Sequence, residues 1–145
     1  MKRNSANALY LIVTVFCLLP YGINAGQNQS TPSPKGAQTY IVYPADGSTV
    51  SSPVTVVFGL RNMGVAPAGT AMENTGHHHL LVDMKQMPDL NKPLGSEVKH
   101  FGGGQTEVEL TLKPGIHTLQ LVLGDQNHVP HNPPVISQKI TFTVK

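Results

Sequence analysis

Residues 107–123 read EVELTLKPGIHTLQLVL, and apolar side chains alternate with other residues on both sides of a turn. The apolar positions before the turn are 108, 110 and 112, and those after it are 119, 121 and 123. A period of two places such side chains on one face of a β-strand. Lys113-Pro114-Gly115 supplies the turn residues between them. The stretch therefore predicts two β-strands joined by a turn, each with one face toward a core.

The same one-sided pattern recurs along most of the chain. Residues 54–60 (VTVVFGL) and 140–144 (ITFTV) each have an apolar face, and no segment has a sustained helical period of 3.6. Short strands at this spacing indicate an all-β fold, namely a single immunoglobulin-like antiparallel β-sandwich of about seven strands. A small barrel is the competing arrangement. The expected strands are 40–43, 54–60, 78–84, 97–101, 107–112, 117–123 and 136–144.

The first 25 residues have the features of a cleavable export signal. Lys2 and Arg3 precede the apolar run 8–19, and Ala25 closes a site suited to signal peptidase. That run is too short to span a bilayer as a permanent anchor. We therefore expect export to the periplasm and no stable membrane insertion after cleavage. The expected organisation is a signal peptide at 1–25, a flexible linker at 26–38 and one β-sandwich domain at 39–145.

Cleavage would change the charge and the metal-ligand chemistry of the chain. Lys2 and Arg3 would leave, which lowers the ten basic residues to eight and balances the eight acidic ones. A mature protein without net charge lacks the electrostatic basis for a nucleic-acid partner. Cys17 is the sole cysteine and would leave too, so no disulfide or thiol ligand would remain. All seven histidines would stay, and they become the chemistry to explain.

The expected strand order brings most of these histidines to one end of the sandwich. One triplet opens the third strand, one histidine ends the fourth, and two lie in the loop before the last strand. In an immunoglobulin-like topology the loops involved cluster together. His117 would lie at the opposite end, where we expect a structural role. The candidate metal ligands are therefore His77, His78, His79, His100, His128 and His131.

The ligand types favour a borderline metal ion. Neutral imidazole binds copper, zinc and nickel, and thioethers such as Met63 and Met72 in the preceding loop would favour copper(I). We therefore expect copper as the cofactor and zinc as the second choice. His77 and His79 share a strand face while His78 points the other way, so either side of the triplet could contribute. Asp125 or Glu73 could add a ligand or orient an imidazole.

Other readings of the same residues remain open at this point. The histidines could form a polar pocket or partner surface in a non-enzymatic binding or structural module of the cell envelope. His78 could be a packed strand residue. An enzymatic role is uncertain, because the chain has no G-x-S-x-G or H-E-x-x-H motif and no identifiable general acid or base. Gly102-Gly103-Gly104 neither follows a buried parallel strand nor opens a helix, which favours a turn with close backbone approach over a phosphate-binding loop.

Several segments together resemble a family of small exported bacterial proteins, the domain of unknown function 4399. The segments are PADGSTVSSPVTVVFGL, GHHHLLVD, HFGGGQTE, LKPGIHTLQLVLGD and the final H-x-P-H-x-P-P-V block. The resemblance covers nearly all of 39–145, and all seven histidines fall inside these blocks. It implies a bacterial, periplasmic, β-rich domain, and it implies no particular reaction.

Overall fold

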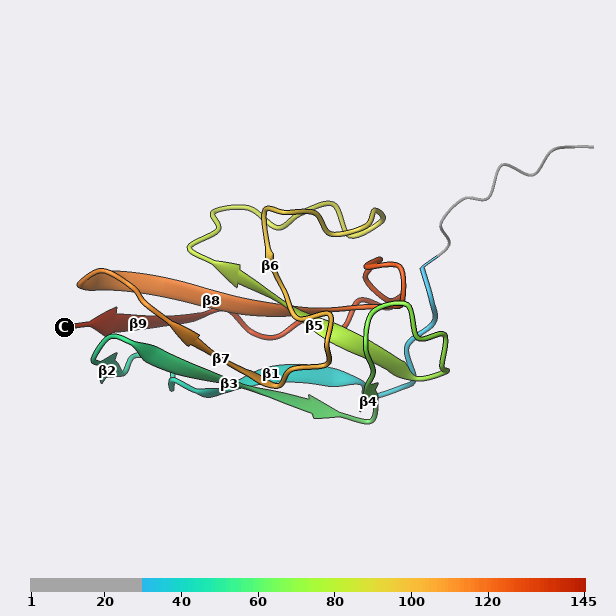
Figure 1. The fold of residues 1–145 in the computed structure, drawn as a ribbon, viewed down its shortest axis with the longest axis horizontal. Helices are drawn as coiled ribbons and strands as arrows, with labels where there is room; N and C mark the ends of the chain where they lie inside the picture. The colour runs from blue at the N-terminus through green and yellow to red at the C-terminus, as the bar shows by residue number, and fades with distance from the viewer. Residues whose placement is uncertain (1–29) are drawn as a thin grey trace, which may run out of the picture.

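The computed structural model describes residues 30–145, which form nine strands and no helix (Figure 1). The expected signal peptide and the first residues of the expected linker lie outside this range. The fold is all-β, as the alternating pattern predicts. Within the described residues no helix is long and apolar enough to cross a membrane. The strands are β1 (Gln38–Tyr43), β2 (Thr49–Val50), β3 (Val54–Arg61), β4 (Gly64–Val65), β5 (Thr75–Val82), β6 (Lys99–His100), β7 (Glu107–Leu110), β8 (Gly115–Gly124) and β9 (Ile140–Val144).

The strands form two sheets that lie one above the other (Figure 1). The smaller sheet has the order β1-β3-β7, and the larger has the order β2-β9-β8-β5-β4, with β6 paired to β5. The turn at 113–114 therefore leads the chain from the smaller sheet into the larger one, because β7 and β8 belong to different sheets. The main pairs β1–β3, β3–β7, β5–β8 and β8–β9 are antiparallel.

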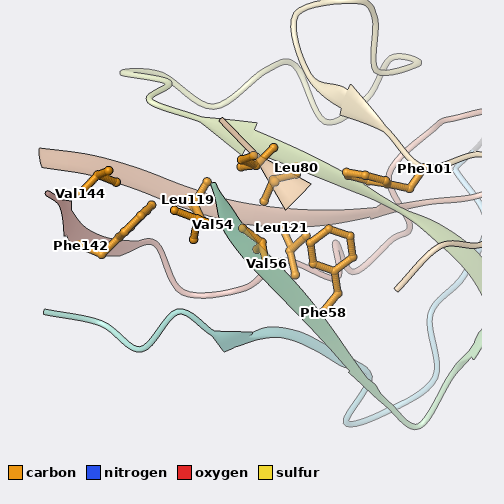
Figure 2. Packing of buried hydrophobic residues seen from close by; sticks show 10 residues of the cluster. Val54, Val56, Phe58, Leu80, Phe101, Leu119, Leu121, Phe142 and Val144 are labelled. Atoms are coloured by element: carbon orange, nitrogen blue, oxygen red, sulfur yellow. The ribbon is translucent and has the colours of Figure 1, made fainter. Parts of the chain in front are cut away.

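The core lies between the sheets and consists of the alternating apolar residues (Figure 2). Val56 of β3 is fully buried, as are Leu80 of β5 and Leu119 and Leu121 of β8. Burying apolar surface contributes about 25 cal/mol per Å² to the stability of the fold. The two sheets are therefore stabilised by packing their apolar faces against each other. The remaining buried members of this core are Val54, Phe58, Phe101, Leu110, Phe142 and Val144.

The fourth expected strand, 97–101, differs from its expectation in length and in partner. Only Lys99 and His100 are in strand conformation, and they pair antiparallel with β5. In the constant-type immunoglobulin arrangement this strand pairs instead with the fifth, in the sheet of the first two. The specific immunoglobulin-like topology therefore stays a prediction. The change of partner matters for the site, because it sets His100 against β5.

The third and last strands also differ from the expected boundaries. β5 begins at Thr75, so the histidine triplet lies inside a strand and not at its opening. β9 begins at Ile140, and Ile136 makes only an isolated bridge to Val122. The residues before His77, Thr75 and Gly76, pair with β4 in parallel, which extends the strand toward the N-terminal side.

A second apolar layer covers the outer face of the larger sheet. Leu81 of β5 and Val122 of β8 point away from the main core and contact Leu94 and Val98. These two residues belong to the segment 83–98, which joins β5 to β6 and lies on the side of the larger sheet away from the smaller one (Figure 1). The outer face of β5 is therefore enclosed, and its side chains are shielded from solvent.

The end of the expected linker makes regular contacts with the domain. Pro32 forms a parallel bridge with Asn132, and the backbone N–H groups of Ser33 and Asn132 donate to the carbonyls of Asn132 and Thr31. These contacts begin at Thr31, eight residues before the expected domain boundary at residue 39. They tie the N-terminal segment to the loop that carries His131.

Candidate metal centre

Four histidines from three separate parts of the chain meet on the outer face of the larger sheet. His77 and His79 come from β5, His100 from β6, and His128 from the loop after β8. Each offers one ring nitrogen, and these four nitrogens all lie within 4.8 Å of one another. The ring centroids of His77 and His79 are 4.7 Å apart, and those of His100 and His128 are 4.6 Å apart. We refer to these four residues as the histidine cluster.

The register of the strands accounts for three members of the cluster. His77 and His79 are two residues apart on β5, so both side chains point to the same face. His79 is directly opposite His100 in the antiparallel pair of β5 and β6. Opposite residues in such a pair project side by side, and the two rings stack at a centroid distance of 5.2 Å.

A hydrogen-bonded loop presents the fourth member, His128. The Asp125 carboxylate accepts hydrogen bonds from the backbone N–H groups of Asn127 (2.8 Å) and Val129 (3.0 Å). The Asp125 carbonyl accepts from the backbone N–H of His128 at 2.9 Å. His128 has a φ of 66°, a left-handed conformation that this closed loop maintains. Its Nδ1 atom consequently lies 3.1 Å from Nε2 of His77.

Two glycines provide the space that the rings occupy. Gly124 is opposite His77 in the ladder, and a Cβ atom there would lie 2.7 Å from Cε1 and 3.1 Å from Nδ1 of His79. A Cβ at Gly102 would collide with the ring of His100. The first glycine of the 102–104 run therefore allows the close approach expected for this turn, here of a histidine ring to the backbone.

Burial keeps the two inner histidines neutral and leaves three of their four ring nitrogens without a hydrogen-bond partner. Desolvation by burial, together with the smaller effect of the neighbouring histidines, lowers the pKa of His77 to about 4 and that of His79 to about 3. Nδ1 of His77 and both ring nitrogens of His79 are buried without a hydrogen-bond partner. A buried polar atom left unpaired destabilises a protein by about 1–3 kcal/mol, so a partner that binds such an atom stabilises the fold. Lone pairs on neutral imidazoles are what a metal ion binds.

The spacing of the cluster is compatible with one ion. Imidazole nitrogens bind zinc at about 2.0–2.1 Å, so two nitrogens on one such ion are about 3.4 Å apart in its tetrahedral geometry. The observed limit of 4.8 Å exceeds this by roughly 1.4 Å, so the rings would have to close in on a common centre to bind one ion. The four nitrogens are near enough for such an adjustment, and the histidine cluster can hold a metal ion.

His78 and His131 are outside this cluster. His78 faces the main core, where its ring lies 5.2 Å from that of Phe58 and where desolvation lowers its pKa to about 4. His131 is buried beside Gly76, with Nδ1 3.3 Å from the carbonyl oxygen of Thr31. Of the six expected ligands, the structure thus brings four together and places these two elsewhere.

Neither carboxylate considered as an extra ligand belongs to the cluster. Asp125 is buried, and its second oxygen accepts a hydrogen bond from Thr31 Oγ1 at 2.6 Å. It holds the loop of His128 rather than an imidazole ring, a role the sequence analysis did not assign. Glu73 is exposed. Met72, considered as a thioether ligand, is 62% exposed.

His117 lies at the opposite end of β8, as expected for a structural residue. Its Nδ1 donates to Asp83 Oδ2 and its Nε2 donates to the carbonyl of Lys113, both at 2.8 Å. The bond to Asp83, followed by that to Lys113, raises the pKa of His117 above its usual 6.5. The protonated ring can satisfy both acceptors at once, because both nitrogens then carry hydrogen.

The stabilisation from His117 is expected to decline as pH rises. Because its folded-state pKa is raised, the contribution is complete below pH 6.5 and is lost as pH rises through the folded-state value. His117→Gln should reduce the free energy of unfolding by about 1 kcal/mol near pH 6 and by less near pH 8.5. Urea unfolding of parent and variant at both pH values measures the difference. An equal loss at both would contradict the charged pairing.

Comparison with known proteins identifies a family without an assigned function. The family model described as Domain of unknown function (DUF4399) matches residues 56–145, from within β3 to the last residue. No curated protein and no solved structure matches the chain. The matched range contains all seven histidines.

Proposed function

The chain belongs to the DUF4399 family, and we propose that it is an exported, periplasmic protein that binds copper through His77, His79, His100 and His128. The observation that carries this proposal is the convergence of four ring nitrogens within 4.8 Å, on a cluster whose inner members His77 and His79 have buried ring nitrogens without hydrogen-bond partners. A metal ion would bind one ring nitrogen of each histidine. If the four histidines served only in packing or as a polar surface, their ring nitrogens would not need to converge.

The composition of the donor set supports copper over the alternatives. All four donors are imidazoles, which suit copper, zinc and nickel. Among divalent first-row ions the affinity of such a site is highest for copper, so zinc is the second choice. Since Cys17 would leave with the signal peptide, no thiolate would redirect the mature protein toward zinc or iron–sulfur chemistry. In the periplasm, the metal bound would depend on which metal ions are available there and on the affinity of the four imidazoles for each.

The proposal predicts one tightly bound copper ion per protein. The full chain would be expressed in a bacterium, and the product purified from the periplasmic fraction. Its intact mass should correspond to a chain that begins at Gly26. Native mass spectrometry during titration with Cu(II), Cu(I) and Zn(II) should show one equivalent of copper, retained in competition with zinc.

Two results would overturn parts of this proposal separately. Recovery of the product only with residues 1–25 intact would contradict export with cleavage. Weak binding of several ions, unchanged by mutation of the cluster, would contradict the metal site and favour the cell-envelope module. His117→Gln is the matched control, because it removes a histidine that is paired with Asp83 outside the cluster. It should bind copper like the parent.

A further inference from the structure

A cavity opens beside two of the four histidines of the cluster. It has a volume of about 340 Å³. His77 and His79 are 1% exposed, whereas His100 is exposed and His128 is half-buried. The buried pair therefore forms the floor of the cluster and the other pair its open side. The residues that line the cavity are Leu94, Gly95, Ser96, Val98, His100 and His128.

The ligands of the cluster would bring no negative charge to a bound ion. All four donors are histidines, and imidazole binds a metal as a neutral group. The nearby buried carboxylate, Asp125, already accepts hydrogen bonds from Thr31, Asn127 and Val129. No ligand of the cluster would therefore neutralise a divalent ion, and Asp125 would offset its charge only through space. Such a charge attracts an anion strongly where water is partly excluded.

We propose that a small inorganic anion binds the metal ion from this cavity, at a coordination position that the four histidines leave open. This inference rests on the proposed metal site. In the binding step the anion replaces a water molecule on the ion, so one metal–oxygen bond breaks and one metal–anion bond forms. The net charge of the divalent centre falls by one, and no electron is transferred.

The dimensions and lining of the cavity limit the class of ligand. Leu94 and Val98 belong to the apolar layer over β5 and β8, so they narrow the approach without adding charge. Ser96 contributes the hydroxyl group of the lining. A volume of about 340 Å³ is near the lower end of ligand-binding pockets. It accommodates ions of a few atoms, such as azide, cyanate or a halide, better than an extended peptide.

The test uses azide as the probe and the copper(II)-loaded, exported protein. Azide bound to copper(II) produces a charge-transfer absorption that neither component has alone, so its growth gives a saturable binding curve. In Ser96→Trp the indole would fill the cavity, whereas Ser96→Ala would keep it open. Ser96 is exposed and outside the cluster, so both variants should fold and take up one copper ion like the parent. We expect Ser96→Trp to weaken azide binding by at least about tenfold and Ser96→Ala to leave it within about twofold.

The outcomes separate this inference from the proposed function. Copper uptake with no azide absorption, or azide binding that Ser96→Trp leaves unchanged, would overturn the anion position while the metal site stands. Failure of the parent to take up copper would overturn both. Azide binding that is saturable and weakened only by Ser96→Trp would support the open coordination position.

Discussion

Replacing His79 by alanine is expected to lower the affinity for copper by more than about 100-fold. Loss of a residue that merely supports a ligand typically lowers metal affinity about 10–100-fold, and removal of a ligand should exceed that. His79 is buried and its two ring nitrogens have no hydrogen-bond partner. In the alanine variant no other group would take the place of its bond to the metal. His77→Ala should behave in the same way. Competitive titration against a chelator of known affinity measures the change.

His78→Leu is the matched control, because His78 is adjacent in sequence but faces the main core. Its two ring nitrogens are buried without hydrogen bonds, and its ring packs against Phe58. Leucine has a similar volume and no polar atoms, so the variant should bind copper like the parent and be equally or more stable. A copper affinity reduced as much by His78→Leu as by His79→Ala would contradict the assignment of the cluster to the outer face.

The comparison within the triplet shows how far the sequence alone can determine the site. A period of two predicts that His77 and His79 share a face and that His78 does not. It does not tell which face is the outer one, because both faces of β5 are buried: the inner against the main core and the outer against segment 83–98. The alternation of apolar and polar residues that marks the exposed face of a strand is therefore absent from β5. Six candidate ligands followed from the sequence, and four converge.

The features that complete the cluster depend on contacts between distant segments. The pairing of His100 with His79 follows from the position of β6 beside β5, which the immunoglobulin-like order does not predict. The need for glycine at 124 follows from the ring of His79 above it. Neither is encoded in a local motif. By contrast, the all-β class and the main core follow from local alternation, which is why the sequence predicts them correctly.

One signal for the loop of His128 is present in the sequence, but it is compatible with more than one role. Asp125 precedes Asn127 by two residues and His128 by three, and aspartate commonly accepts hydrogen bonds from backbone N–H groups two residues later. Its residue type alone also predicts a metal ligand or a residue that orients an imidazole. The structure shows its carboxylate accepting three hydrogen bonds within the protein. The distinction is one of geometry, since the residue type is compatible with both roles.

Asp125→Ala is expected to lower both the stability of the protein and its affinity for copper. The substitution removes the acceptor of hydrogen bonds from Thr31 Oγ1, the Asn127 N–H and the buried Val129 N–H. Leaving such donors unpaired should reduce the free energy of unfolding by about 2–4 kcal/mol. Because the same bonds close the loop that carries His128, copper affinity should fall about 10–100-fold. Urea unfolding of the metal-free protein and competitive copper titration measure the two effects.

Asp46→Ala is the control for the loss of a carboxylate that accepts a backbone hydrogen bond. Asp46 Oδ1 accepts from the Thr141 N–H at 2.8 Å in an exposed turn. Its loss should reduce stability by only about 1 kcal/mol and leave copper affinity unchanged. If Asp125→Ala lowered copper affinity without lowering stability, the carboxylate would be a metal ligand rather than a support for His128. We expect instead that stability and copper affinity fall together, because both depend on the closed loop that brings His128 to His77.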